Sequence, residues 1–342
     1  MLVKIFNTYS GNMPDCRVQM AHFSLHLAII ITKSKRMSSN LTITGRIQEY
    51  VYTILYHALI LSIIICHMFP KTLWRLIKTS PAPGAWNMAL DEAILQFTAA
   101  GRTPPTLRLY AWEPACLSLG YAQPVKDVDF QNLIENGWEL VRRPTGGRAI
   151  LHTDELTYAV IAPQTEPRVA GSILESYRRL SSALVSALHL LGLPATADKE
   201  YPLPEGSQPN AAVCFEVPSN YEITVHGKKL IGSAQARRYK GVLQHGSLPL
   251  YGDLTRITQV LRFDSEDERR QAAIRLLDHA TTVETVLGKV LDWETAANAF
   301  KAAFEQVLNI EFVETQPEPE ELSCAEELFL QKYAHSSWTE RI

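Results

Sequence analysis

Cysteine is scarce in this sequence, and no two cysteines form a CxxC pair. The chain of 342 residues has five of them, Cys16, Cys66, Cys116, Cys214 and Cys324. Thiols that are odd in number and widely spaced argue against a disulfide scaffold, and the missing CxxC argues against a zinc knuckle. We therefore expect no metal site and a reducing, cytoplasmic setting in which one thiol is available for chemistry.

The sequence also has no large excess of positive or negative charge. Lys and Arg number 33, Asp and Glu number 36, and the formal net charge is −3, which disfavours a protein that coats nucleic acid. Hydrophobic residues make up 46% of the chain and charged residues 20%, which allows a sizeable core and argues against wholesale disorder. At roughly 150 residues per domain, the length predicts two domains, or one large domain with an appendage.

The first 70 residues differ from the rest of the chain. They contain two apolar runs, 23–32 and 51–69, and the second is just long enough for a membrane span, which needs about 20 residues. That run also carries His57, Ser62 and His67, which suit a span poorly. Three interpretations stay open. The segment can be an upstream extension without a folded role, in which case Met68 is the true start. It can also be a membrane anchor or an integral element of the fold. A membrane contact is expected only if the extension is real.

The remainder predicts an α+β fold. Alternating or β-rich segments predict strands at 74–78, 106–112, 116–121, 138–142, 148–151, 156–161, 221–225, 229–233 and 241–250. Helical spacing and end signals predict helices at 87–100, 127–136, 173–191, 255–261, 266–277, 283–290, 293–308 and 319–333. The chain thus divides into a sheet-rich body at 71–252 and a helical C-terminal part at 253–342.

Two segments could carry chemistry around glycines. The first, RRPTGGRAILH at 142–152, links two predicted strands, and its adjacent Gly146 and Gly147 allow backbone N–H groups to approach a ligand. A tight hairpin with solvated arginines is the competing interpretation, and no P-loop lysine follows. The second, HGKKLIGSAQ at 226–235, places Lys229 on a strand beside small residues. An exposed edge lysine is the alternative there.

Two further residues are candidates on weaker grounds. Cys214 lies at a junction between a loop and a strand, where a thiol can be exposed enough to react, although a buried and inert cysteine is more common. His245 lies on the last predicted strand of the body, where a histidine can bind a ligand or simply be a hydrogen-bonded core residue.

Taken together and in this order, the motifs change the interpretation. The segments RRPTGGRAILH, CFEVPSNYEITVHGKKLIGSAQARR and GVLQHGSLPL resemble the lipoate/biotin protein ligase superfamily, that is, the biotin/lipoate A/B protein ligase catalytic domain. The opening segments WRLIKTSPAPGAWNMALDEAIL and LRLYAWEPACLSLGYAQ also look like its first strands and helix. This resemblance covers nearly everything from Trp74 onward. It implies a mixed, largely antiparallel sheet packed with helices, with residues 71–252 as the catalytic body.

Within the superfamily, the cysteine suggests the class. Cys214, Glu216, Tyr221 and Lys229 are similar to the motif of a cysteine-dependent protein N-octanoyltransferase. The other octanoyltransferase class has its cysteine where this chain has Val242, so the resemblance excludes it. Biotin ligases are disfavoured because their GRGRRGR-type loop is absent.

The resemblance also implies an activity. Cys214 would take an octanoyl group from acyl carrier protein as a thioester and pass it to a lysine of a lipoyl-accepting protein, such as glycine cleavage H protein or a 2-oxoacid dehydrogenase lipoyl domain. Lys229 would stabilise the developing oxyanion. The implied substrate-binding residues are Arg142, Arg143, Thr145, Gly146, Gly147, Arg148, His152, Gly232, Ser233, Ala234 and His245.

Two alternatives to this activity stay open. An ATP-dependent lipoate ligase would need ATP and Mg²⁺, whereas the transferase needs no cofactor. A non-catalytic protein that binds the lipoyl domain or the carrier would need neither.

The octanoyltransferase hypothesis also predicts which residues hold the substrate. Aliphatic candidates for an acyl tunnel are Leu117, Leu119, Leu151, Val160 and Ile231, which are also ordinary core residues. Candidates for a basic rim that meets an acidic carrier protein are Arg142, Arg143, Arg237, Arg238 and Lys240.

Overall fold

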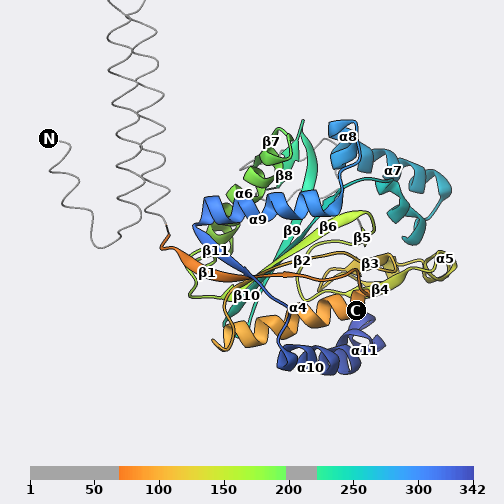
Figure 1. The fold of residues 1–342 in the computed structure, drawn as a ribbon. Coiled ribbons are helices and arrows are strands. Elements are labelled where there is room, and N and C mark those ends of the chain that lie inside the picture. The colour runs from red at the N-terminus through yellow and green to blue at the C-terminus, as the bar shows by residue number, and fades with distance from the viewer. Residues whose placement is uncertain (1–68, 198–221) are drawn as a thin grey trace, which may run out of the picture. The chain divides into compact units, whose positions relative to one another are not determined.

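An eight-stranded sheet runs through the part of the chain that the computed structural model describes, residues 69–197 and 222–342 (Figure 1). Its strands, in spatial order, are β11 (Ile310–Glu314), β1 (Thr72–Lys78), β2 (Thr106–Tyr110), β6 (Glu155–Pro163), β10 (Gly241–Pro249), β9 (Lys228–Arg238), β8 (Ile223–Val225) and β7 (Ala195–Ala197). A smaller sheet has the order β4 (Glu139–Arg142), β3 (Cys116–Leu119) and β5 (Ile150–His152).

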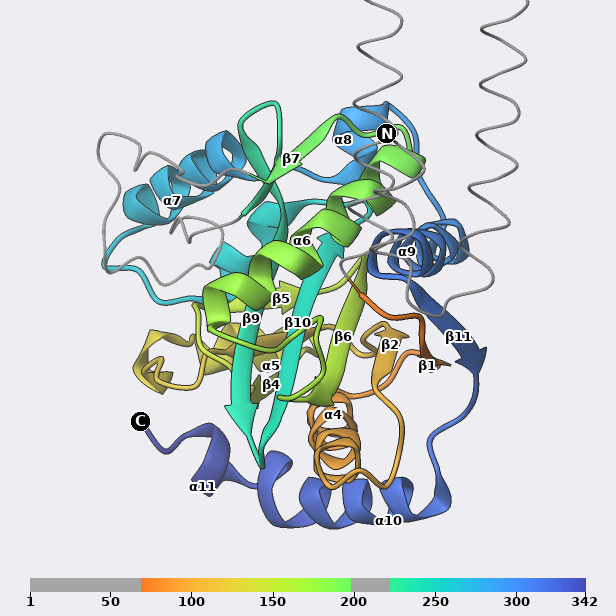
Figure 2. The ribbon, with the colours of Figure 1, turned by 90° about the vertical axis from the view of Figure 1, so that its left-hand side faces the viewer.

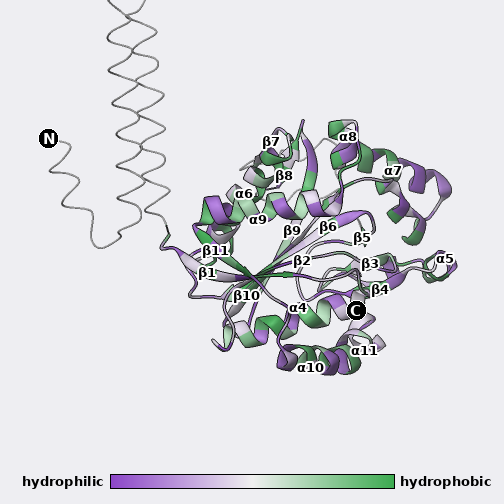
Figure 3. Cartoon of the chain, in the orientation of Figure 1, coloured by the Kyte–Doolittle hydropathy of each residue, from purple (hydrophilic) through white to green (hydrophobic). Residues whose placement is uncertain are grey.

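Antiparallel pairing dominates the large sheet. Strand β10 pairs antiparallel with both β6 and β9, and β6 pairs antiparallel with β2. Strand β1 is the exception, because it runs parallel to β2 on one side and to β11 on the other. Every residue of β10 is buried, and Figure 3 shows that the middle of the sheet is largely hydrophobic. A strand buried on both faces needs helices above and below it.

Helices supply that cover on the two faces (Figure 2). Helices α4 (Gly84–Ala99) and α10 (Pro319–Leu328) pack together on one side, and α6 (Ile173–Leu190) and α9 (Trp293–Leu308) pack together on the other. The remaining helical segments are α5 (Phe130–Glu135), α7 (Glu266–His279), α8 (Val283–Leu287), α11 (Ser336–Thr339), the 3₁₀ helices at Val125–Asp127 and Leu254–Val260, and a π-helical turn at Phe329–Tyr333.

Local signals explain where two of these helices begin. Helix α6 starts at a capping box, in which the Ser172 side chain accepts from the backbone of Glu175 and the Glu175 side chain accepts from the backbone of Ser172. Helix α4 starts at Gly84, one turn before the cap that the sequence suggests at Asn87. The Asn87 amide instead donates to the carbonyls of Ala82 and Ala111, at 3.1 and 3.0 Å, and joins the helix to the end of β2.

The α+β class and the largely antiparallel sheet are confirmed. The C-terminal part is mostly helical, but the description as helical is incomplete, because β11 extends the main sheet. Strand β9 is also longer than the expected 229–233, and the helix expected at 255–261 is a 3₁₀ helix.

Residues Lys71–Ile342 form one compact unit. The division at residue 252 and the roles considered for residues 1–68 stay predictions, and residues 1–68 lie outside the described part. None of the helices in the described part is long and apolar enough to cross a membrane.

Candidate active site

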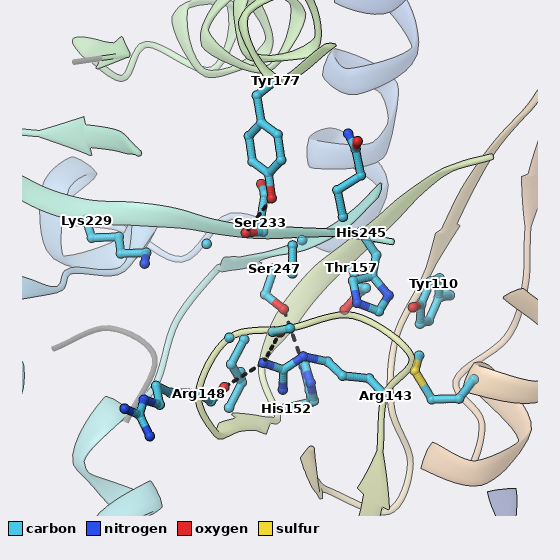
Figure 4. Close-up of a pocket in the computed structure, with 18 of the residues that line it drawn as sticks. Tyr110, Arg143, Arg148, His152, Thr157, Tyr177, Lys229, Ser233, His245 and Ser247 are labelled. Atoms are coloured by element: carbon cyan, nitrogen blue, oxygen red, sulfur yellow. Dashed lines mark hydrogen bonds between the residues drawn. The ribbon is translucent and has the colours of Figure 1, made fainter. Parts of the chain in front are cut away.

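A cavity of about 670 Å³ opens between the first part of β9, the second half of β10, the start of α6 and the loop that joins β4 to β5 (Figure 4). We call this loop, residues 143–149, the glycine-rich hairpin. The cavity is lined by Met88, Tyr110, Trp112, Arg143, Gly146, Gly147, Arg148, Ile150, His152, Thr157, Ile173, Leu174, Tyr177, Lys229, Gly232, Ser233, Ala234, Gln235, His245, Gly246 and Ser247.

Arg143 holds the glycine-rich hairpin from the inside. One guanidinium nitrogen donates to the carbonyl and the hydroxyl of Ser118, at 2.8 and 2.9 Å, and the other donates to the carbonyls of Gly146 and Arg148, at 3.0 and 2.6 Å. Because the side chain is buried, these bonds replace water around the charge. The arginine therefore fixes the shape of the hairpin that forms one wall of the cavity.

A close backbone approach fixes the other side of the hairpin. A Cβ atom at Gly120 would lie 1.8 Å from the carbonyl oxygen of Gly147. The neighbouring Tyr121 N–H donates to the carbonyl of Thr145 at 2.8 Å. Gly147 itself has a φ of 92°, in the region that favours glycine. The chain after β3 and the hairpin thus pack backbone against backbone, and residue 120 must be glycine.

His152 lies in a buried hydrogen-bond network at the base of the cavity. Its Nδ1 and Nε2 atoms lie 2.7 Å from Glu155 Oε1 and from Ser118 Oγ. Its ring stacks on Trp112 at a centroid distance of 3.9 Å. Burial raises the pKa of Glu155, but His152 and the hydroxyls around the carboxylate outweigh burial and lower it overall. Glu155 therefore stays ionised and holds the imidazole in place.

His245 reaches the cavity from β10. Its Nε2 lies 2.6 Å from Thr145 Oγ1, and its Nδ1 lies 3.7 Å from the carboxylate of Asp91. Burial lowers the pKa of His245, which Asp91 opposes only in part. Asp91 also accepts from Arg108 at 2.7 Å in an ion pair whose two side chains are fully buried. The imidazole is thus neutral near pH 7 and joins α4, β10 and the hairpin.

Lys229 brings a buried cation to the cavity. It lies on β9, is 3% exposed, and its ammonium forms an ion pair with Glu222 at 2.5 Å. The neighbouring Lys228 turns the other way, as strand geometry requires, and donates to the carbonyl of Leu277 at 2.5 Å. The Lys229 ammonium can donate to an oxygen that becomes negative in the cavity, and Glu222 balances its charge before the substrate arrives.

Most of the substrate-binding residues expected from the sequence lie together at this cavity. Those that line it, besides Lys229, are Arg143, Gly146, Gly147, Arg148, His152, Gly232, Ser233, Ala234 and His245. Two expected residues lie behind the wall. Arg142 is fully buried and donates to the carbonyls of Gly120, Gln123 and Thr339, at 2.8, 2.6 and 2.9 Å. Thr145 is a buried residue of the hairpin, and its hydroxyl faces His245. Cys214 lies outside the described residues.

The aliphatic residues expected to form an acyl tunnel do not line the cavity. None of Leu117, Leu119, Leu151, Val160 and Ile231 lines the cavity. Leu117 and Leu119 pack into a core cluster on the small sheet, and on β5 the neighbouring Ile150 lines the cavity instead of Leu151. A shift of one residue moves a side chain to the other face of a strand. Apolar wall is supplied by Met88, Tyr110, Trp112 and Tyr177, which the sequence alone did not single out.

The expected basic rim is also smaller than the sequence suggested. Arg142 and Arg143 are buried and bound to carbonyl groups. Arg237 donates to the carbonyls of Gly171 and Val169, at 2.7 and 3.1 Å. Arg238 and Lys240 lie nearer the surface at the far end of β9 and its turn. A contiguous rim of five cations is therefore wrong for this fold.

Comparison with known proteins defines the class. The model of the lipoyl protein ligase A/B catalytic domain matches residues 83–305, and the chain belongs to this family. Among curated relatives, it is 41% identical over 273 residues to octanoyltransferase LipM of Kyrpidia tusciae, covering 78% of this chain and 98% of the relative. It is 36% identical over 275 residues to octanoyltransferase LipM of Bacillus subtilis, with the same coverage.

Solved structures agree with this assignment. A bipartite lipoate protein ligase from Thermoplasma acidophilum has a TM-score of 0.66 at 26% identity, covering 79% of this chain and 96% of that one. A lipoate-protein ligase A bound with ATP has a TM-score of 0.63 at 27% identity, covering 79% and 99%. The resemblance of the sequence motifs to the lipoate ligase superfamily is thereby confirmed.

Proposed function

We propose that this protein is an octanoyltransferase of lipoate biosynthesis, which moves an octanoyl group to a lysine of a lipoyl-accepting protein. The single observation that carries the proposal is the similarity to relatives named octanoyltransferase, 35–41% identical over at least 95% of their length. The cavity agrees with that activity, since it combines an apolar wall with a buried lysine.

The chemistry we propose has two acyl-transfer steps. The Cys214 thiolate attacks the carbonyl carbon of octanoyl-acyl carrier protein, and the carrier thiol leaves. The acceptor lysine, in its neutral form, attacks the resulting thioester, the amide bond forms, and Cys214 leaves as the thiolate while the amine loses its proton. A thioester exchange is nearly balanced and the amide is more stable, so the reaction needs no ATP. Sulfur suits both steps because it is a good nucleophile and a good leaving group.

Lys229 supports the negative charge that develops on the carbonyl oxygen in both steps. Donors fixed in advance inside a water-poor cavity stabilise such an oxyanion by several kcal/mol, typically about 3. Lys229 is fixed by its place on β9 and by Glu222. The exposed backbone at Gly146 and Gly147 faces the same cavity and can supply a second donor.

The apolar wall receives the acyl chain. Seven buried aliphatic carbons stabilise the bound state by about 5 kcal/mol, at about 0.8 kcal/mol each. Met88, Tyr110 and Trp112 form the closed, buried part of the wall, and Ile173 and Leu174 lie at the open side, where both are substantially exposed. Acyl carrier protein is the proposed donor, and glycine cleavage H protein or a 2-oxoacid dehydrogenase lipoyl domain is the proposed acceptor.

The test is a single turnover with octanoyl-acyl carrier protein and no ATP. We expect intact-mass spectrometry to find an octanoyl adduct on the wild-type chain and none on Cys214→Ser. Cys324→Ser is the matched control, because Cys324 lies in α10, which packs on α4, and does not line the cavity. An adduct that survives in Cys214→Ser, or full transfer by that variant, would contradict the covalent mechanism.

A second candidate is an ATP-dependent lipoate ligase. The observation that favours it is the similarity in fold to lipoate ligases, one of them solved with ATP. Octanoylation or lipoylation by Cys214→Ser that requires ATP and Mg²⁺ would support it. Binding of the acceptor domain without either reaction would instead indicate a non-catalytic protein.

A further inference from the structure

Two arginines beside the glycine-rich hairpin are held by aromatic rings. The guanidinium carbon of Arg238 lies 4.9 Å from the centroid of the Tyr121 ring, and that of Arg341 lies 3.9 Å from the same ring and 4.4 Å from Trp338. Neither arginine forms an ion pair with a carboxylate of residues 69–197 or 222–342, whereas the nearby Lys332 pairs with Glu92 at 2.6 Å. One Arg341 nitrogen donates to the Tyr121 carbonyl at 2.6 Å. A guanidinium has five N–H donors, so a stacked arginine with one such bond can still donate to an anion.

These arginines adjoin a second hollow of about 450 Å³, lined by Tyr121, Ala122, Gln123, Pro144, Gly146, Gly147, Arg148, Gln235, Ala236 and Arg238. Four of its residues, Gly146, Gly147, Arg148 and Gln235, also line the acyl cavity. The two hollows therefore meet along the glycine-rich hairpin. A linear ligand with its acyl end in the cavity can cross the hairpin and place its other end beside the arginines.

The electrostatics of this second hollow favour an anion. Arg341 lowers the pKa of the Tyr121 phenol, first through its hydrogen bond and then through its charge, and Arg238 adds to the effect. Arg341 and Arg238 also act to lower the pKa of Lys332, after burial, which is the largest cause. Both arginines thus add positive potential at the groups around this hollow, although Glu92 opposes their effect at Lys332. Charge-assisted hydrogen bonds from arginine to phosphate are among the stronger polar contacts.

We propose that Arg238 and Arg341 bind the phosphodiester of the phosphopantetheine arm that carries the acyl thioester. The inference rests on the proposed function and adds a recognition site for the donor. The acyl chain lies in the cavity, the thioester lies near Lys229 and the hairpin, and the phosphate lies over Tyr121. The enzyme thus recognises the donor through its acyl chain and through its phosphate. The acceptor lysine reacts only with the thioester and does not use the phosphate site.

The test compares two small donors that differ by one phosphate, S-octanoyl-pantetheine and S-octanoyl-4′-phosphopantetheine. The measured quantity is the second-order rate of acyl-enzyme formation, and the phosphate effect is the ratio of the two rates. We expect the wild-type ratio to be at least tenfold. Arg238→Gln and Arg341→Gln should each reduce it several-fold, leaving the rate with the phosphate-free donor within twofold. Arg270→Gln, on the exposed face of α7, should keep the wild-type ratio.

The outcomes separate this site from the function on which it rests. If wild-type enzyme is acylated by both donors at the same rate, the phosphate site is wrong and the transferase stands. If neither small donor nor octanoyl-acyl carrier protein acylates the enzyme, the proposed function fails and the site fails with it. Acylation by octanoyl-acyl carrier protein alone would show that the phosphate is not enough for recognition, and the site would be wrong while the transferase stands. An equal loss with both donors in Arg341→Gln would assign that arginine to holding the C-terminal segment. Arg238→Gln, on a different element, then decides the proposal, and Arg238→Lys should restore part of the ratio.

Discussion

At the scale of single residues, the adjacent lysines on β9 make different contacts, and in the proposed mechanism only Lys229 stabilises the oxyanion. We expect Lys229→Ala to slow acyl-enzyme formation at least a hundredfold, because removing one fixed donor to an oxyanion costs about 3 kcal/mol. Lys228→Ala is the matched control and should change the rate less than threefold, since its ammonium bonds the carbonyl of Leu277. Stopped-flow or quenched mass spectrometry measures the rate. A larger loss in Lys228→Ala than in Lys229→Ala would contradict this assignment.

Arg142 and Arg143 show what a sequence motif alone does not predict. The resemblance implies that both bind substrate. The structure shows Arg142 and Arg143 bound to main-chain carbonyls, with Arg143 also facing the cavity. A motif gives residue types and spacing, but the direction of a long side chain depends on which carbonyls the tertiary fold brings near. Gly120 was missed for the same reason, since its neighbour is Gly147.

At the scale of elements, local patterns were sufficient for most strands and helices. The long helices α6 and α9 carry caps and apolar stripes, and both were predicted to within a residue. Strand β11 was missed because five residues with exposed charges show little alternation, and its partner β1 is more than 230 residues away. Parallel pairing over such a separation leaves no local signal.

The C-terminal segment is an element whose importance only the structure reveals. The Trp338 indole donates to the carbonyl of Arg142 at 2.8 Å, and the Arg142 side chain donates to the carbonyl of Thr339 at 2.9 Å. The N–H of Val125 donates to the carbonyl of Ile342 at 2.7 Å. The last turn of the chain therefore fastens the end of β4, from which the glycine-rich hairpin begins.

Trp338 tests this fastening. Trp338→Phe keeps an aromatic ring under Arg341 and loses one donor, so we expect it to destabilise the fold by about 1 kcal/mol and to leave transfer within threefold. Trp338→Ala also loses the ring contacts with Tyr333 and Tyr121, and should destabilise further and slow transfer about tenfold. Urea unfolding and the acyl-enzyme rate are the measurements. Leu330→Ala, a highly exposed neighbour, is the control, and a loss as large in that variant would refute the fastening role.

At the scale of the whole molecule, buried ionisable groups connect the sheet to the helices around the cavity. Asp91 on α4 pairs with Arg108 on β2, and it also faces His245 on β10. Burial raises the pKa of Asp91, but Arg108 and His245 outweigh burial and lower it. Glu155 behaves in the same way through His152. Folding thus lowers the pKa values of Asp91, Glu155 and His245. Each of these groups therefore binds fewer protons in the folded state than in the unfolded state.

Because folding lowers all three pKa values, we expect the protein to lose stability in acid. His245 releases its proton more readily in the folded protein. Its contribution to the free energy of unfolding is therefore complete above the unfolded-state pKa of about 6.5 and decreases as the pH falls below that value. Asp91 and Glu155 contribute fully above their unfolded values of about 4, and that part is lost at lower pH. Urea midpoints measured from pH 7.5 to 4 should fall continuously. His245→Gln should remove the decrease that begins near pH 6.5 and keep the one below about pH 4.5, and an unchanged upper phase in this variant would show that His245 is not its source.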